Sequence, residues 1–195
     1  MDRIILDLCG GTGSWSRPYR EAGYDVRVIT LPEYDVREYV PPGNVYGILA
    51  APPCTEFSSA KHFHGKGNYT HNFLEGLEIV SACMRIILTC KPKFWVIENP
   101  ASGYLKKWLG EPAMTFDPWE YGDNYQKTTA LWGEFNHPPK TVKEKPPELV
   151  KFSMLKSKEI FPEYYGVYSR QERRAITPPG FAMAFYEANS VEDGE

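Results

Sequence analysis

The sequence predicts an α/β fold, a doubly wound parallel sheet with helices on both faces. Three short apolar runs, at residues 3–8, 45–51 and 93–98, are separated by longer segments. In the clearest of these segments, 73–90, apolar residues recur at helical spacing. Strands that alternate with amphipathic helices are typical of a parallel sheet. Because the carboxyl ends of parallel strands form the ligand crevice, we expect a site along that edge.

The other elements are predicted in chain order from turn residues and periodicity. Glycines after the first run indicate a tight turn, followed by a helix at 14–22 and a strand at 24–29. Downstream of residue 98, the pattern predicts a short helix at 101–109, a strand at 128–133, a connector rich in Pro and Lys at 137–147, a closing helix at 181–189 and an acidic tail at 191–195.

The composition is that of an ordinary soluble domain. The 195 residues are 42% hydrophobic and 24% charged, enough for one domain with a sizeable core. The net charge of −3 gives no general reason to expect nucleic-acid binding, but residues 140–174 carry nine Lys/Arg against five Asp/Glu. No apolar stretch approaches the roughly 20 residues of a membrane span. Four cysteines without zinc-type spacing and no signal peptide before the first strand predict a cytoplasmic location.

The first turn reads Asp-Leu-Cys-Gly-Gly-Thr-Gly at residues 7–13. Glycines let the backbone approach a ligand, and a helix start offers free N–H donors. A dinucleotide fingerprint would read Gly-x-Gly-x-x-Gly. The order here, with Asp7 three residues ahead of the first glycine, is more similar to that of methyltransferases that bind S-adenosylmethionine. A tight turn without a ligand stays open as the alternative.

That similarity implies a set of cofactor contacts. Asp7 would lie beneath the turn, and the glycine backbone would hold the methionine end. Asp35 is a candidate partner of the adenine amino group, with an exposed loop acid as the alternative. The implied cofactor contacts are Asp7, Cys9, Gly10, Gly11, Gly13, Asp35 and Pro52.

Two further strand ends carry reactive side chains. Cys54 follows Pro52 and Pro53 at the end of the run at 45–51, so its thiol should sit at the start of a loop. Glu98 closes the run at 93–98, where desolvation raises the pKa of a carboxylic acid and favours the protonated donor. The alternatives are an inert buried cysteine and a glutamate that caps the following helix. A nucleophile and an acid on one sheet edge favour covalent chemistry on a heterocycle.

Taken together, these motifs resemble the cytosine-5 DNA methyltransferases, in the compact form of phages and prokaryotes. The motifs are Asp-Leu-x-x-Gly-x-Gly at 7–13, Pro-Pro-Cys-x-x-Phe-Ser at 52–58 and Glu-Asn-Pro at 98–100. The resemblance covers about residues 3–135 and resumes weakly at 179–182. It implies a Rossmann-like, S-adenosylmethionine-dependent methyltransferase fold in a bacterial or phage-infected cell. It also implies that DNA is the partner, with the target cytosine flipped out of the helical stack.

The resemblance also implies roles for single residues. Cys54 matches the nucleophile that adds to carbon 6 of cytosine, and Glu98 matches the acid that hydrogen-bonds ring nitrogen 3. Carbon 5 would then take the methyl group. The implied substrate contacts are Pro53, Ser58, Asn99, Pro100 and Gln126.

The chain departs from the family pattern in three places. Family members usually carry Gln-x-Arg-x-Arg after the acid motif, whereas residues 125–130 read Tyr-Gln-Lys-Thr-Thr-Ala. Gln126 matches the glutamine, and Lys127 could replace an arginine as a point charge near the thiol. Cys9 stands where an aromatic residue often contacts adenine, so Trp15 is either its replacement or a core residue. The recognition lobe is also reduced.

The reduced lobe suggests three regions: a catalytic core at 1–135, a recognition or connector region at 136–177, and a helix returning to the core with the tail at 178–195. Lysines interleaved with aromatic residues in the middle region could contact DNA, or form a solvated surface over an aromatic cluster. Arg170, Arg173 and Arg174 are candidate phosphate contacts or a solvated helix face. We expect a monomer, with a separate recognition partner as a further option.

Three other functions stay open. An amino-group methyltransferase would need a polar residue before Pro52 and an aromatic one after Pro53, and the chain has neither. The same carbon-5 chemistry could act on a free nucleotide or RNA, or use a modified donor. A silent binding protein could have kept the fold. His62, His64 and His71 lack a ligand set with metal-site spacing, so no metal is expected.

Overall fold

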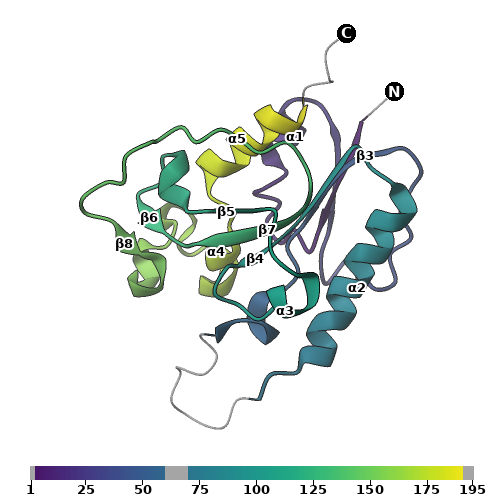
Figure 1. Ribbon diagram of the computed structural model, residues 1–195, viewed down its shortest axis with the longest axis horizontal. Helices are drawn as coiled ribbons and strands as arrows, with labels where there is room; N and C mark the ends of the chain where they lie inside the picture. Colours follow the sequence, from purple (N-terminus) through teal and green to yellow (C-terminus); the bar gives the residue numbers. More distant parts are fainter. Residues whose placement is uncertain (1–2, 60–69, 191–195) are drawn as a thin grey trace.

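The computed structural model describes residues 3–59 and 70–190, which form three layers (Figure 1). A six-stranded sheet has the order β2-β1-β3-β4-β7-β5, and β6 pairs with β8 separately. The strands are β1 (Ile4–Leu8), β2 (Asp25–Ile29), β3 (Val45–Ala50), β4 (Phe94–Pro100), β5 (Met114–Phe116), β6 (Tyr125–Gln126), β7 (Thr129–Glu134) and β8 (Val150–Lys151). The helices are α1 (Arg17–Glu21), α2 (Phe73–Cys90), α3 (Lys106–Leu109), α4 (Arg170–Ala175) and α5 (Pro179–Ser190). Short 3-10 helices are η1 (Cys54–Glu56), η3 (Pro118–Tyr121), η4 (Phe152–Met154), η5 (Ser157–Glu159) and η6 (Pro162–Tyr164).

Strands β2, β1, β3 and β4 form the parallel part of the sheet, and the predicted α/β fold is confirmed. β7 instead runs antiparallel to both β4 and β5. The chain passes from β5 to β7 through η3 and β6 rather than through a helical crossover, so β7 can return in the opposite direction. Its pairing with β4 includes Asn99 with Ala130 and Pro100 with Thr129. β4 therefore extends two residues beyond its predicted end.

Alternating strand residues build a separate hydrophobic core on each face of the sheet. Ile4, Leu6 and Leu8 of β1 belong to the cluster that includes the buried face of α2. Ile5 belongs to the other cluster, which contains residues of α1 and α5. Figure 1 shows α2 on one side of the sheet, with α1 and α5 together on the other. Helices thus cover both faces, as predicted.

The helix predicted at 73–90 is confirmed as α2, and local caps explain its limits. The Asn72 side chain accepts a hydrogen bond from the backbone N–H of Glu75 at 3.3 Å, which satisfies a donor of the first turn. Lys91 ends the helix in the left-handed conformation, with φ of 47°. Within the described part of the chain, no helix has both the length and the apolar character that crossing a membrane requires.

Two predicted helices are shorter than expected because long-range contacts hold the chain in turns. The helix predicted at 14–22 begins only at Arg17, since Ser16 is buried and its hydroxyl donates to Asp7. The helix predicted at 101–109 is reduced to α3. There the Tyr104 N–H donates to the Phe57 carbonyl at 2.7 Å. In an α-helix that started at residue 101, this N–H would be used for a hydrogen bond within the helix. α5 begins two residues before its predicted start.

The C-terminal segment, defined here as residues 150–175, is held by side chains more than by regular structure. Arg173 is 3% exposed, and its guanidinium donates to the carbonyls of Ser157, Ile160 and Tyr168. The ring of Phe152 is buried as well. The prediction that Arg173 contacts phosphate or solvent is wrong, because its donors are used inside the segment.

Candidate active site

Asp7 forms the buried floor of the first turn. Its side chain is fully buried, and Oδ2 accepts a hydrogen bond from the Ser16 hydroxyl at 2.6 Å. Among the described residues, Oδ1 has no hydrogen-bond partner. Burial raises the pKa of Asp7 to about 6, and this outweighs the lowering by the Ser16 hydrogen bond and the Arg20 charge.

The glycine turn lies directly on this carboxyl group. A Cβ atom at Gly10 would lie 2.4 Å from Cγ of Asp7, so only glycine fits there. Gly11 and Gly13 have positive φ values of 53° and 67°. A Cβ at Gly11 would meet none of the described atoms within 4 Å, so the turn is open at this point. The turn therefore offers backbone groups and free space beside an unsatisfied carboxylate oxygen.

The structure does not bring every predicted cofactor residue to an open surface. Cys9 packs against the core cluster that contains the buried Cys83 of α2, and its proximity raises the pKa of the Cys83 thiol. Trp15 is 2% exposed and packs against Phe181 and Phe185, with ring centroids 6.1 and 5.6 Å away. Trp15 is therefore a core residue and does not replace an adenine contact.

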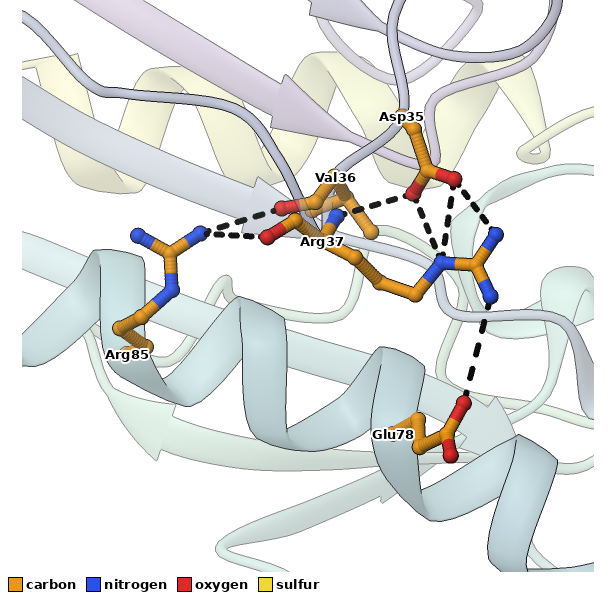
Figure 2. Close-up of polar contacts among 5 residues, drawn as sticks. All are labelled: Asp35, Val36, Arg37, Glu78 and Arg85. Carbon is orange, nitrogen blue, oxygen red and sulfur yellow. Dashed lines mark hydrogen bonds and ion pairs between the residues drawn. The ribbon is translucent and has the colours of Figure 1, made fainter.

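Asp35 lies in the loop that follows β2. Its carboxylate accepts hydrogen bonds from Nε of Arg37 at 2.9 and 3.0 Å and from the backbone N–H of Arg37 at 2.9 Å, as Figure 2 shows. These bonds lower the pKa of Asp35 to about 2. Arg85 of α2 donates to the carbonyls of Val36 and Arg37 and so anchors the loop (Figure 2). The Asp35 carboxylate is thus charged and fixed, and its contact with adenine stays a prediction.

The ends of β3 and β4 lie side by side. Ala50 pairs with Ile97, so the residues after Ala50 face the end of β4. The fully buried Asn99 strengthens this junction, because its Nδ2 donates to the Pro52 carbonyl at 3.0 Å. The side chain of Asn99 thus ties the nucleophile turn to the acid strand, whereas the sequence predicted a substrate contact. The junction brings the turn that carries Cys54 to the same edge of the sheet as the end of β4, which carries Glu98.

Cys54 is exposed to solvent at the start of η1, where the backbone N–H of Ser58 donates to its carbonyl at 2.8 Å. The surrounding protein raises the pKa of the Cys54 thiol by desolvation, and Glu98 raises it further. Burial likewise raises the pKa of Glu98, while the Lys127 charge lowers it. The acid is therefore disposed to stay protonated, and the thiol needs positive charge to ionise.

Two cations supply such charge. Lys127 and Arg174 both lower the pKa of Cys54. Nζ of Lys127 donates to the backbone carbonyl of Arg174 at 3.2 Å. Sequence reasoning placed Arg174 among phosphate contacts, because no local signal connects α4 with the thiol.

Other predicted substrate residues have separate positions. The amide of Gln126 donates to the carboxylate of Asp117 at 3.3 Å, so it is not brought into the group around Cys54. β6 holds Gln126 in place by pairing with Lys151 of β8. Pro53 is exposed beside the thiol, and Pro100 is half-buried at the end of β4.

The histidines of the metal hypothesis are mostly beyond the described ranges. His62 and His64 lie outside the described residues. Nδ1 of His71 lies 2.7 Å from the backbone carbonyl oxygen of Glu56, and its ring stacks on Phe73. Within residues 3–59 and 70–190, no group of three or more His, Cys, Asp and Glu side chains could hold a metal ion.

An open glycine turn over a buried acid thus lies on the sheet edge at which the strands before Cys54 and at Glu98 also end. No protein-family model matches the chain. It is 31% identical over 150 residues to the "Probable DNA (cytosine-5)-methyltransferase" of Frog virus 3 (isolate Goorha), a match that covers 66% of this chain and 69% of the viral protein. The chain therefore belongs to the DNA (cytosine-5)-methyltransferase family, as its motifs predict.

Two solved structures are similar to the chain at low sequence identity. A prophage-encoded DNA modification methyltransferase of E. coli aligns with a TM-score of 0.48 and 16% identity, covering 73% of this chain and 52% of its own. The Entamoeba histolytica methyltransferase EhMeth aligns with a TM-score of 0.44 and 14% identity, covering 77% of this chain and 57% of its own. The chain thus spans little more than half the length of these two proteins.

Proposed function

We propose that this protein transfers a methyl group from S-adenosylmethionine to carbon 5 of cytosine in DNA, through a covalent bond to Cys54. The observation that carries the proposal is the junction of β3 and β4. There the Asn99 side chain is hydrogen-bonded to the Pro52 carbonyl, so the turn that carries Cys54 and the strand that carries Glu98, a carboxylic acid whose pKa is raised, meet at one edge of the sheet. A thiol and a proton donor together are what addition to an electron-poor pyrimidine ring requires.

In the proposed reaction, Cys54 is the nucleophile and Glu98 is the proton donor. The Cys54 thiolate forms a bond to carbon 6 of the ring, the ring π electrons shift toward nitrogen 3, and Glu98 gives its proton to that nitrogen. Carbon 5 is then the nucleophilic carbon of an enamine. After methylation, water takes the carbon-5 proton, and the electrons of that bond restore the ring double bond and expel the thiolate. The nitrogen-3 proton returns to Glu98, so both side chains end in their starting states.

The first turn fits the proposed cofactor. The unsatisfied Oδ1 of Asp7 and the open backbone at Gly11 offer an acceptor and donors to the polar end of such a molecule. Asp35 would accept from the adenine amino group, and Pro52 would border the cofactor. S-adenosylmethionine, when bound, supplies a methyl group on a positively charged sulfur, the electrophile that an enamine carbon requires.

DNA as the substrate is supported by family membership and by surface charge. Five lysines near and within the C-terminal segment are exposed and available to phosphate oxygens: Lys143, Lys145, Lys151, Lys156 and Lys158. A base inside a duplex cannot reach the thiol, so the target cytosine would have to leave the stack. The small size of the recognition region predicts short sequence specificity or a partner that supplies recognition.

The test is a covalent trap. The protein is incubated with S-adenosylmethionine and duplex DNA that contains 5-fluorocytosine, and intact masses are measured. Fluorine at carbon 5 blocks the last deprotonation, so the adduct persists. We expect a protein–DNA adduct in the wild type and in the control Cys90→Ala, and none in Cys54→Ala.

Other outcomes distinguish the competing functions. An adduct formed only with single-stranded DNA, RNA or a free nucleotide would overturn the duplex substrate. Absence of any adduct, although S-adenosylmethionine binds in calorimetry, would overturn the covalent mechanism in favour of a silent binder. An adduct that survives in Cys54→Ala would overturn the choice of nucleophile.

A further inference from the structure

The outer face of α2 carries an apolar stripe. Its residues are spaced alternately three and four apart, which is the pattern of a helix that packs along a second helix. They are Leu74, Leu77, Ser81, Met84 and Leu88. Leu74 is 77% exposed and Leu88 is 68% exposed, although the opposite face of α2 is buried in the core. Single exposed leucines are common, but a stripe with this spacing, on the outer layer of the molecule in Figure 1, indicates a helical partner.

The stripe is one wall of a groove, and α3 provides the other wall. The groove has a volume of about 720 Å³, and Trp108 of α3 lines it together with residues of α2 that include Met84 and Leu88. Trp108 is 42% exposed, and its ring packs against that of Phe73, with centroids 5.0 Å apart. An open groove between an aromatic ring and aliphatic side chains fits the apolar side chains of a partner helix.

The stripe is symmetric about its centre. Leu74 and Leu88 each lie seven residues from Ser81. Leu77 and Met84 lie four and three residues from it. In two copies of α2 that pack antiparallel, with a two-fold axis at Ser81, Leu74 of each copy therefore meets Leu88 of the other, and Leu77 meets Met84 in the same register. The small side chain of Ser81 lets the two helices approach closely where they cross.

Charges beside the stripe are complementary in this register. Glu78 and Arg85 lie on the same side of α2 (Figure 2), three and four residues from Ser81. In the antiparallel pair, Glu78 of each copy therefore meets Arg85 of the other. Within one chain, Arg85 donates to backbone carbonyls of the loop after β2, and none of the described carboxylates forms an ion pair with it. Glu78 reaches only Nη1 of Arg37, at 4.0 Å.

We propose that the groove between α2 and α3 binds a second copy of this chain, with the two α2 helices antiparallel at the centre of a two-fold dimer. Leu74 of each copy enters the groove of the other beside Leu88. A second copy is favoured over a different protein because the apolar stripe and the charges are both self-complementary about one axis. This inference stands apart from the proposed function. It departs from the monomer expected from the sequence, which does not show which face of α2 the sheet leaves exposed.

The first test measures the mass of the full chain in solution, without DNA or methyl donor. Sedimentation velocity from about 1 to 200 µM should show a monomer–dimer equilibrium, as expected for a small interface. Leu88→Asp places a charge in the apolar stripe of both copies, so the dissociation constant should rise by at least about 100-fold. Met154→Asp changes an apolar residue outside this surface that is 74% exposed, and it should leave the equilibrium unchanged.

Charge reversal tests the antiparallel register. Glu78→Arg alone or Arg85→Glu alone sets like charges opposite each other on both sides of the axis, so each variant should dimerise at least about 10-fold more weakly than the wild type. An equimolar mixture of the two variants restores both pairs of opposite charges and should dimerise again. Any change in the loop that Arg85 anchors is present both in the single variant and in the mixture, so it cannot produce this recovery. Circular dichroism checks that each variant is folded.

Each part of the proposal can fail. A wild-type chain that stays monomeric at the highest concentration would overturn the second copy as the occupant of the groove. A dimer that Leu88→Asp leaves intact would place the interface elsewhere. A mixture of the charge variants that stays monomeric would overturn the antiparallel register. None of these results affects the 5-fluorocytosine adduct, which tests the proposed function separately.

Discussion

The sheet edge that carries Cys54 and Glu98 and the C-terminal segment, residues 150–175, are held by different forces. At the edge, main-chain pairing fixes Cys54 and Glu98, because β3 and β4 are in register up to Ala50 and Ile97. The C-terminal segment has only 3-10 turns, a two-residue strand and α4, and buried side chains hold it to the core. Main-chain pairing thus positions Cys54 and Glu98, whereas buried side chains such as Arg173 hold the C-terminal segment. Substitutions at the sheet edge should therefore change the reaction rate, whereas substitutions in the segment should change how stably it is folded.

The largest expected effect is that of Glu98→Gln, which tests the edge. Loss of the proton donor should lower kcat by about 10²- to 10⁴-fold. Methyl incorporation into duplex DNA measures this loss. Glu134→Gln, at the far end of the β4–β7 pairing, is the control. Turnover within tenfold of the wild type would remove the acid role.

Arg173→Met should have the next largest effect, and it tests how the segment is held. Without the guanidinium, the carbonyls of Ser157 and Ile160 lose their donor. We expect a loss of about 3 kcal/mol in the free energy of unfolding, measured with urea, and faster proteolysis within residues 150–175. Arg170→Met, on the exposed side of α4, should change neither. An unchanged urea midpoint in Arg173→Met would show that packing, not hydrogen bonding, holds the segment.

The same comparison explains which parts of the molecule can be predicted from the sequence. β1, β3, β4 and α2 are predictable because periodicity and turn residues determine them locally. The positions of Asp7, Glu98 and Cys54 are predictable as well, since parallel strands end at one edge of the sheet. Arg174, the tie from Asn99 to Pro52 and the burial of Trp15 depend on contacts between distant segments. Such contacts leave no pattern in nearby residues, so they become visible only in the fold.

Asp7→Asn should have a smaller effect that depends on pH, and it tests the edge beneath the glycine turn. Because the pKa of Asp7 is raised from 3.8 to about 6, its contribution to stability is complete below pH 3.8 and is lost as pH rises through 6. The wild type should therefore lose about 2 to 3 kcal/mol relative to Asp7→Asn between about pH 4 and pH 8. Urea unfolding across this range measures the difference. Parallel curves for the two proteins would mean that Asp7 is charged in the folded state throughout.

The smallest effect is expected at Asp35, where the edge meets solvent. Exposed ion pairs add little stability, so neither Asp35→Asn nor Arg37→Gln should move the urea midpoint. Cofactor binding separates the two variants. If the Asp35 carboxylate accepts from the adenine amino group, Asp35→Asn should weaken S-adenosylmethionine binding about 5- to 10-fold in calorimetry. Arg37→Gln keeps the acceptor and should weaken it less. Equal losses in both variants would instead mean that the Asp35–Arg37 pair fixes the conformation of the loop. A side-chain contact, and not main-chain pairing, would then position this loop at the sheet edge.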